Sequence, residues 1–436
     1  MPQFLSTTDE DFEARFAELL SQKREDSPEV DDVVAGIIKD VRTRGDAAVI
    51  ELTSKFDRLD LTPDTLAFSQ AEIEAECESV SAEEREALML AAHRIRAYHS
   101  RQKPTDESWV DEAGATLGWR WTPVTTAGLY VPGGLASYPS SVLMNAIPAQ
   151  VAGVENLVIC VPTPDGVVNP LVLLAAQLSG VETIYRIGGA QAIAAMAYGT
   201  QTILPVDKIT GPGNAYVAAA KRRVFGKVGI DMIAGPSEIL VIADRHNDPD
   251  WLALDLLSQA EHDENAQAIL VTNDVNFGQA VAEAVNARLE TLQRRDIAGA
   301  SWRDFGAVIT VRDMGEAAAL TDRVAPEHLE LCVQFPEPLA ENIRHAGAIF
   351  MGGYTPEAIG DYVAGPNHVL PTARSARFSS GLSVLDFMKR TTITKMTPES
   401  LQAIGPAAET LANSESLQAH GLSVRARLNR LNAGNN

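Results

Sequence analysis

Short apolar runs that alternate with helical stretches begin near Gly128, and this alternation constrains the fold more than any other feature of the chain. The runs predicted to be buried strands cover residues 157–161, 183–187, 208–210, 239–243, 268–272, 307–311 and 348–351. Segments with helical spacing lie between the first of them, at residues 170–179, 191–198 and 215–224. Strands that alternate with helices imply βαβ crossovers and mostly parallel sheets. Ligands of such folds bind at the carboxyl ends of strands, so we expect the functional site there.

The two ends of the chain differ from this middle part. Residues 1–125 read as helical, with a capping box predicted at Ser81 and Glu84, whose side chains each accept from the other residue's backbone amide. After Arg390 the pattern predicts a separate helical tail, whose first helix opens with Thr397 as N-cap and Pro398 at the first helical position. We interpret these helices as packing elements.

The net charge argues against two classes of partner. The 436 residues include 36 lysines and arginines against 58 aspartates and glutamates, for a formal net charge of −22. Such a surface repels phosphate backbones and anionic lipids, so neither a nucleic acid nor a membrane is expected as a partner. The length predicts about two to four domains.

Neither an export signal nor a disulfide framework is recognisable. The N-terminus has early acidic residues and lacks the basic and apolar regions of a signal peptide. No stretch approaches the roughly 18 to 20 apolar residues that span a bilayer. Three separated cysteines, Cys77, Cys160 and Cys332, match no disulfide framework and no CxxC site. We therefore expect a cytoplasmic protein.

Three glycine-rich turns lie close together along the chain, at residues 128–134 (GLYVPGG), 187–191 (IGGAQ) and 210–214 (TGPGN). Glycines after a strand let the backbone approach a phosphate closely and expose the amides of a helix N-terminus. None of the three reads G-x-G-x-x-G, so the dinucleotide fingerprint is absent. The spacing alone leaves open both ordinary strand-to-helix turns and a nucleotide-binding crevice.

Two segments carry candidate metal ligands. Gln259 and His262 are three residues apart in a predicted helix, which places both on one face. An imidazole nitrogen and an amide oxygen can both bind zinc, although a histidine exposed on a helix is the simpler interpretation. Asp361 and His368 lie in a segment rich in glycine and proline, where the carboxylate either serves a site or caps backbone amides.

Glu327 and His328 are adjacent and follow Pro326, which stiffens the turn. A glutamate and a histidine ordinarily titrate on either side of neutral pH, which suits proton transfer. The pair is therefore a candidate for acid–base catalysis, and a solvated loop is the alternative.

Seven stretches together resemble the histidinol dehydrogenase family. They read GLYVPGGLASYPSSVLM, IGGAQAIAA, DKITGPGNAYV, DMIAGPSEILVIAD, LLSQAEH, APEHLEL and GDYVAGPNHVLPT. With weaker flanking similarity, the match runs in the family's order from about Arg44 to about His420, and several stretches are long enough to be specific. The chain is therefore identified as a member of this family.

The resemblance implies an enzyme of histidine biosynthesis that uses NAD and zinc to oxidise L-histidinol twice, giving L-histidine. The residues implied to hold one zinc ion per subunit are Gln259, His262, Asp361 and His420. Those implied to contact NAD are Tyr130, Gln191 and Asn214. Glu327 is implied to activate water, and His328 to act as the general base. The residues implied to contact the substrate are Ser237, Gln259, His262, His328, Asp361, His368, Glu415 and His420.

The resemblance also implies the fold and the assembly. It predicts two incomplete Rossmann-like α/β domains with mostly parallel sheets, and small helical extensions at both ends. The predicted limits are 1–25 for the N-terminal extension, 26–128 with 238–382 for a catalytic domain with the zinc site, 129–237 for an NAD-binding domain, and 383–436 for the C-terminal tail. A homodimer is expected, in which the tail crosses to the neighbouring subunit and completes its site with Glu415 and His420.

Two other functions stay open on the sequence. A paralogue on the same fold could oxidise another small alcohol, such as a sulfonated diol, although Ser237, His368 and Glu415 match the family's site for an imidazole and an amine. A zinc hydrolase could use Glu327 and His328 to activate water, but it would need no dinucleotide crevice.

Overall fold

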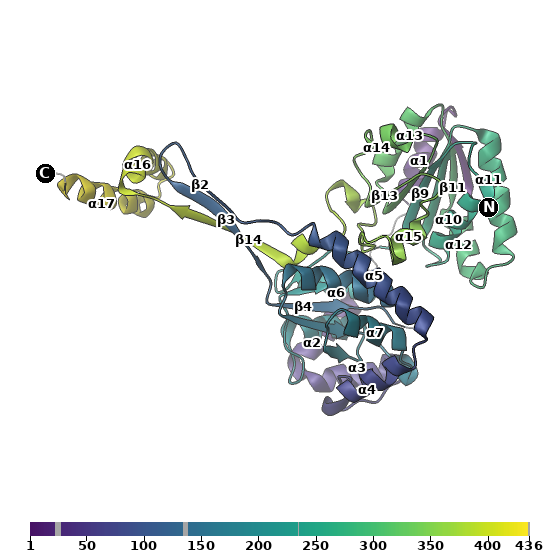
Figure 1. The fold of residues 1–436 in the computed structure, drawn as a ribbon, viewed down its shortest axis with the longest axis horizontal. Coiled ribbons are helices and arrows are strands. Elements are labelled where there is room, and N and C mark those ends of the chain that lie inside the picture. The colour runs from purple at the N-terminus through teal and green to yellow at the C-terminus, as the bar shows by residue number, and fades with distance from the viewer. Residues whose placement is uncertain (22–27, 134–137, 234, 435–436) are drawn as a thin grey trace. The chain divides into compact units, whose positions relative to one another are not determined.

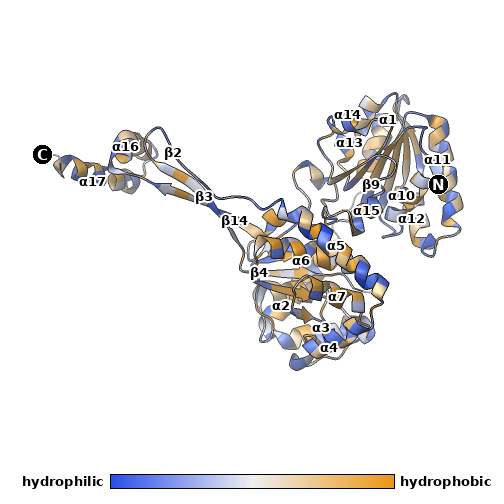
Figure 2. Ribbon diagram, in the orientation of Figure 1, coloured by the Kyte–Doolittle hydropathy of each residue, from blue (hydrophilic) through white to orange (hydrophobic). Residues whose placement is uncertain are grey.

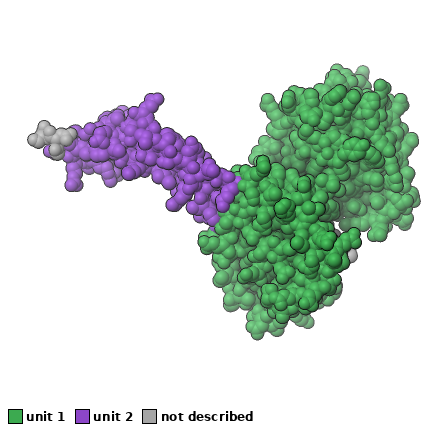
Figure 3. Space-filling model, in the orientation of Figure 1, with its two compact units in different colours: residues 1–102, 125–387 green, residues 103–124, 388–436 purple. Residues whose placement is uncertain are grey.

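The computed structural model describes residues 1–21, 28–133, 138–233 and 235–434. The chain forms two compact units, of residues 1–102 with 125–387 and of residues 103–124 with 388–436 (Figure 3). The first unit contains two parallel sheets, and the second contains an antiparallel sheet with two helices (Figure 1). Within the described residues, no helix is both long and apolar enough to cross a membrane.

Sheet A has six parallel strands in the order β1-β11-β10-β9-β12-β13. Its strands are β1 (Gln3–Ser6), β9 (Glu238–Ala243), β10 (Gln267–Thr272), β11 (Ala307–Thr310), β12 (His328–Cys332) and β13 (Ala348–Met351). The helices that follow these strands are α1 (Phe12–Ser21), α10 (Pro249–Ala260), α11 (Val275–Leu289), α12 (Arg295–Phe305), α13 (Met314–Val324), α14 (Pro336–Ala340) and α15 (Glu357–Tyr362). The strand order reverses between β9 and β12, as in a doubly wound sheet.

Side chains of β9 contribute to two hydrophobic cores on opposite faces of sheet A. Ile239, Val241 and Ala243 pack in the core with α10, α11 and α12. Leu240 and Ile242 pack in the core with α1, α13 and α14. Successive residues of a strand face opposite sides, so a strand covered on both faces must be apolar throughout. Figure 2 shows the hydrophobic residues gathered on these strands.

Sheet B has five parallel strands in the order β6-β5-β4-β7-β8. Its strands are β4 (Thr126–Tyr130), β5 (Asn156–Cys160), β6 (Thr183–Tyr185), β7 (Lys208–Thr210) and β8 (Gly229–Ile230). The helices of this part are α2 (Pro28–Arg44), α3 (Asp46–Asp57), α4 (Gln70–Glu78), α5 (Ala82–Ser100), α6 (Pro139–Ala152), α7 (Pro170–Leu178), α8 (Gly189–Tyr198) and α9 (Ala215–Val224). One hydrophobic core joins α2 and α3 to α8 and α9.

The second unit is built on an antiparallel sheet in which β3 (Thr116–Pro123) is the central strand, between β2 (Glu107–Val110) and β14 (Met388–Lys395). Two helices follow, α16 (Pro398–Ser414) and α17 (Gln418–Gly434). Thr397 caps α16, because its Oγ1 accepts from the amide of Ser400 at 3.1 Å.

The predicted fold class is confirmed, and every strand predicted from the apolar runs is present. The capping box at Ser81 and Glu84 is also confirmed, with both amide contacts at 3.2 Å. The prediction that residues 1–125 are helical is only partly right, since β1, β2 and β3 lie within them. β1 and β2 have four residues each and β3 is mostly half-buried, so none of the three contains the buried apolar run by which strands were recognised. The prediction of a helical tail after Arg390 is also only partly right, since β14 continues to Lys395 before α16 begins. The four-part domain division stays a prediction.

Candidate active site

Glu327 and His328 lie at the amino end of β12, beside the amino end of β9. The two strands are parallel, with His328 paired to Ile239, so the pair lies next to Glu238 at the start of β9. The backbone amide of Glu238 donates to Glu327 Oε2 at 2.9 Å, and its carbonyl accepts from His328 Nδ1 at 3.0 Å. Both side chains are buried. The alternative of a solvated loop is therefore wrong.

The position of this pair also corrects the expectation about the sheet edge. Glu327 precedes β12 and Glu238 begins β9, so the cluster lies at the amino edge of sheet A rather than at the carboxyl ends of its strands. The general rule for open α/β sheets places ligands at the other edge. Here the candidate acid–base residues come from strand starts, because the parallel pairing of β9 with β12 brings these starts together.

The hydrogen bond of His328 to Glu238 fixes the tautomer of its imidazole. A carbonyl oxygen can only accept, so Nδ1 carries the hydrogen and Nε2 keeps its lone pair in the neutral ring. Within the described part of the chain, Nε2 has no hydrogen-bond partner. It lies 3.8 Å from Glu357 Oε1 and 3.8 Å from Asp361 Oδ1. A buried nitrogen with an available lone pair can take a proton from a bound ligand.

The short helix α15 supplies two carboxylates to this cluster. Glu357 and Asp361 are four residues apart and therefore share a face of α15. One ligand atom from each, together with one ring nitrogen of His328, lie within 4.8 Å of one another. The three residues form a group of metal-binding type around one small volume.

Gln259 and His262 lie at the end of α10, which ends at Ala260, so His262 falls just beyond the helix. Gln259 is fully buried, and its carbonyl accepts from the amide of His262 at 3.2 Å. Its side-chain amide has two possible orientations next to Glu357. In one, Nε2 donates to Glu357 Oε1 at 3.1 Å and Oε1 accepts from the amide of Glu238 at 3.2 Å. In the other, the two side-chain oxygens face each other, and a cation between them would offset their repulsion.

Burial shifts the pKa values of this cluster so that the neutral form of each group is favoured. It raises the pKa of Asp361 well above its usual value, and the charge of Glu357 adds to this effect. It likewise raises the pKa of Glu327, with a further contribution from Glu238. Burial lowers the pKa of His262, and it lowers the pKa of His368 to about 3. The cluster thus combines buried carboxylates with neutral imidazoles.

This donor set fits a divalent ion such as zinc. Zinc binds neutral imidazole nitrogen and carboxylate oxygen, and its positive charge offsets the repulsion of carboxylates that lie together. The amide oxygen of Gln259 can face the same volume in one of its two orientations. Asp361 in the 4.8 Å group and Gln259 beside Glu357 are therefore compatible with the ligand role implied by the resemblance, whereas His262 is not a member of that group.

His368 and Ser237 lie beside this cluster. His368 Nδ1 is 3.8 Å from Asp361 Oδ1, and its Nε2 is 3.3 Å from the hydroxyl oxygen of Ser141, in α6. Ser237 immediately precedes Glu238 and is half-buried, and its carbonyl accepts from the amide of Gln267 at 3.0 Å. Both residues can therefore contact a ligand that reaches the start of β9.

The residues implied to contact NAD lie at the carboxyl edge of sheet B. Tyr130 ends β4, Gln191 lies in the first turn of α8 after β6, and Asn214 caps α9 after β7. The amide of Gly189 donates to the hydroxyl of Tyr130 at 3.1 Å, and Asn214 Oδ1 accepts from two amides of α9. Burial raises the pKa of Tyr130 to about 12.

The glycine turn at residues 210–214 has a structural requirement of its own. A Cβ at Gly211, whose φ is +113°, would lie 2.0 Å from the carbonyl oxygen of Tyr130. The turn at 210–214 is therefore packed tightly against the end of β4. The ordinary structural interpretation explains the glycines there without excluding a nucleotide. Gly134, the last residue of the first turn, lies outside the described residues.

The remaining two candidates belong to the second unit. Glu415 is the residue at which α16 ends, and His420 lies in the first turn of α17. Both are exposed in the single chain. The other ten candidate residues lie in the first unit.

Two carboxylates of the site were not recognised in the sequence. Glu357 lies four residues before Asp361, and this i, i+4 spacing is the signal that could have revealed Glu357. Glu238 opens an otherwise apolar strand, and buried acids are rare unless they serve a partner or a site.

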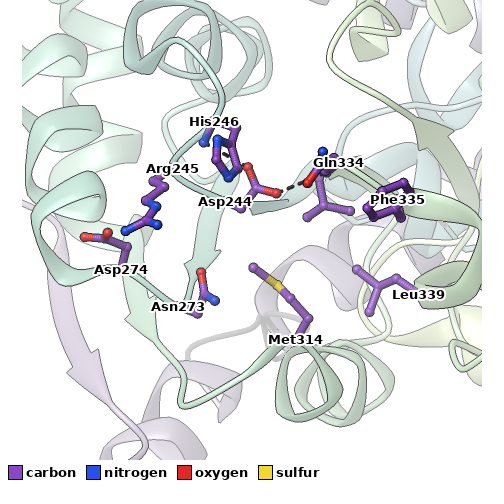
Figure 4. Close-up of a pocket in the computed structure, with 10 residues that line it drawn as sticks. Asp244, Arg245, His246, Asn273, Asp274, Met314, Gln334, Phe335 and Leu339 are labelled. Atoms are coloured by element: carbon purple, nitrogen blue, oxygen red, sulfur yellow. Dashed lines mark hydrogen bonds between the residues drawn. The ribbon is translucent and has the colours of Figure 1, made fainter.

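A separate hollow of about 510 Å³ lies at the opposite, carboxyl edge of sheet A (Figure 4). Asp244, which follows β9, accepts there from the amides of His246 at 2.9 Å and Gln334 at 3.0 Å. Asp274 in the same hollow caps α11. These carboxylates have their hydrogen bonds within the protein, and none of the twelve candidate site residues lines the hollow.

The fold and the site together define a class: an α/β protein with a buried cluster of histidines and carboxylates of the kind found in enzymes. The model of the family described as "Histidinol dehydrogenase" matches residues 20–428. The chain belongs to the histidinol dehydrogenase family.

Individual relatives agree with this assignment. The chain is 77% identical over 434 residues to "Histidinol dehydrogenase" of Cereibacter sphaeroides, covering 100% of both chains. It is 76% identical to the protein of the same name from Ruegeria pomeroyi, covering 99% of this chain and 100% of that one. The crystal structure of histidinol dehydrogenase from Elizabethkingia anophelis superposes with a TM-score of 0.94 at 38% identity, over 99% of both chains.

Proposed function

We propose that this chain oxidises L-histidinol through L-histidinal to L-histidine with NAD, and that it holds one zinc ion per subunit. Membership of the family supports the reaction. The observation that carries the mechanism is the buried imidazole of His328, whose Nε2 keeps a lone pair and faces Asp361 and Glu357.

Gln259, His262 and Asp361 would hold the zinc, with His420 supplied by the tail of a second subunit. The ion would supply a template that orients the substrate, rather than a Lewis acid on the reacting oxygen. Ser237, His368 and Glu415 would fix the orientation of the same substrate. Tyr130, Gln191 and Asn214 would contact the dinucleotide, which accepts one hydride in each step.

In the first oxidation, His328 Nε2 takes the proton of the substrate hydroxyl. The carbon that bears this hydroxyl loses a hydride to NAD. The alcohol thus becomes an aldehyde with loss of one proton and one hydride. The Nδ1 hydrogen bond to Glu238 leaves the base in the right tautomer before the substrate arrives. Burial of the site keeps bulk water away from the aldehyde.

In the second oxidation, Glu327 takes a proton from the water that adds to the aldehyde carbon. After His328 has released its first proton to solvent, it takes a hydroxyl proton from the hydrate. The hydrate loses a second hydride to a second NAD, which leaves the carboxylic acid. The raised pKa of Glu327, caused by burial, makes it a stronger base than an exposed glutamate. General acid–base assistance of this kind contributes roughly 10²- to 10⁴-fold in rate.

A homodimer is part of the proposal. Glu415 and His420 lie in the second unit and are exposed in the single chain, which suits residues that serve a neighbouring subunit. The cytoplasmic location stays a prediction.

One assay tests the proposed function. Purified protein is given L-histidinol and NAD, and NADH formed is counted against substrate consumed, with and without a metal chelator. Two NADH per histidinol are expected, with loss of turnover after chelation and recovery on adding zinc.

Each competing outcome identifies a different error. No NADH with histidinol but turnover of a sulfonated diol would favour the paralogue, which the comparisons do not favour. Ester or amide cleavage without NADH would favour a hydrolase. Full turnover without metal would show that the reaction does not need zinc.

A further inference from the structure

Glu357 is a buried carboxylate for which the reaction described above has no role. Its side chain is 2% exposed at the start of α15, and its backbone amide donates to Glu330 Oε1 at 2.6 Å. Among the described residues, no lysine or arginine forms an ion pair with it. Burying a charge without a cationic partner costs free energy, so the position calls for a compensating group.

The Glu357 carboxylate contacts both helix α10 and residues of the site. Oε2 accepts from the hydroxyl of Ser258 at 2.9 Å, and Oε1 lies 3.8 Å from His328 Nε2. Asp361 lies one helical turn further along α15, within the 4.8 Å group. Glu357 is therefore held on one side by α10 and faces the proposed ion on the other.

Its closest relationship is with the side-chain amide of Gln259. When Nε2 of Gln259 faces Glu357 Oε1, at 3.1 Å, the amide oxygen accepts from the backbone amide of Glu238 at 3.2 Å. When the amide oxygen faces Glu357 instead, two acceptors meet, which only a cation makes favourable. Metals bind amides through oxygen, so the charge of Glu357 couples the orientation of Gln259 to the presence of the ion.

We propose that Glu357 is a positioning residue for the metal: it orients the amide of Gln259, supports Asp361 on the same helical face and adds a second buried negative charge beside the ion. This inference rests on the zinc of the proposed function. Residues that orient metal ligands without being ligands themselves affect binding by about 10- to 100-fold in affinity.

The test measures zinc binding directly, by competition of the metal-free chain with a chromophoric chelator. Glu357→Gln keeps the size of the side chain and removes the charge, and it should raise the zinc dissociation constant by about 10- to 100-fold. Glu357→Asp keeps the charge and should restore part of the loss. Glu341→Gln, which removes the same charge from an exposed position, should bind zinc like the parent chain.

A spectroscopic readout separates positioning from general stability. With cobalt in place of zinc, the visible absorption of Glu357→Gln should differ from that of the parent chain, because the ligand geometry changes. Ser258→Ala, which removes the 2.9 Å hydrogen bond to Glu357, should weaken zinc binding by a smaller factor. This variant provides the test if Glu357→Gln does not fold. An unchanged zinc dissociation constant and cobalt spectrum in the folded variant would overturn the inference. A parent chain that binds no zinc would instead overturn the zinc site itself, and the inference with it.

Discussion

His328 donates from Nδ1 to the backbone carbonyl of Glu238 at 3.0 Å, so the pairing of two strands fixes the tautomer of the proposed general base. The same residue, Glu238, donates its amide to Glu327 at 2.9 Å. One peptide segment of β9 thus positions both members of the proposed acid–base pair. A change in the register of β9 against β12 would disturb both roles together.

Glu327→Gln should spare the oxidation of histidinol to histidinal more than the oxidation of histidinal to histidine. The amide cannot take a proton from water, and the second step should fall by about 10²- to 10⁴-fold. Steady-state rates of NADH formation from each substrate measure the two steps. Glu337→Gln, an exposed matched change, should leave both rates unaltered. Equal losses in both steps would contradict the assigned role.

His262→Asn should lose bound zinc and turnover together while NAD binding persists. The ligand would be lost from the end of α10, whereas Tyr130, Gln191 and Asn214 at sheet B are untouched. Zinc per subunit from elemental analysis and NAD affinity from titration calorimetry provide the comparison. His246→Asn, at the carboxyl edge of sheet A, is the matched control. Full turnover in a zinc-free His262→Asn chain would remove this residue from the site.

Two inactive variants should restore activity when their subunits are mixed. If His420 of one subunit serves the site of the other, a dimer of His420→Asn with His328→Asn contains one site with both residues intact. Random exchange of subunits would then give about one quarter of the parent activity. The measurement is turnover after unfolding and refolding the two variants together. No recovery, from subunits shown to exchange, would place His420 in its own subunit's site or outside it.

The stability of the metal-free chain should fall as the pH drops below about 6.5, in part through His99. Burial lowers the pKa of this fully buried histidine from 6.5 to about 4. Between these values the unfolded chain binds the proton and the folded chain does not, so the contribution is complete above 6.5 and is lost as the pH falls toward 4. From about pH 7.5 to about pH 5 the free energy of unfolding should fall by about 2 kcal/mol more than in His99→Gln. Denaturant titrations at the two pH values measure this difference. An equal change in the free energy of unfolding for both chains would refute it.

Lys221→Met should destabilise the part of the chain around sheet B by about 3–5 kcal/mol. Lys221 and Asp231 form a fully buried ion pair, and both hold Gly211: its carbonyl accepts from Lys221 Nζ at 2.9 Å and its amide donates to Asp231 Oδ2 at 2.8 Å. The single change leaves a buried carboxylate without its cation. Adding Asp231→Asn removes that charge, so the double variant should recover part of the loss. Denaturant unfolding of the parent chain, Lys221→Met and the double variant measures these differences. A double variant less stable than Lys221→Met would contradict the explanation.

Much of the fold was accessible from local patterns along the chain. The apolar run of β9 predicted a strand buried on both faces, because such a strand has no side free for polar residues. The capping box at Ser81 with Glu84, and Thr397 followed by Pro398, predicted helix starts correctly, since both signals depend on residues no more than three positions apart. The family motifs named the candidate residues, and the geometry now shows how several of them lie together.

Only the tertiary structure decided where these residues meet. Glu327 and His328 are adjacent in sequence, but their hydrogen bonds depend on β9 being the neighbour of β12. Glu357 became part of the site because α15 packs near the end of α10, which periodicity does not reveal. Local spacing specifies backbone conformation over a few residues, whereas the choice of neighbouring strands and helices follows from burying many distant side chains at once. For this reason the sequence determined the elements and the candidate residues, and the packed chain decided their chemistry.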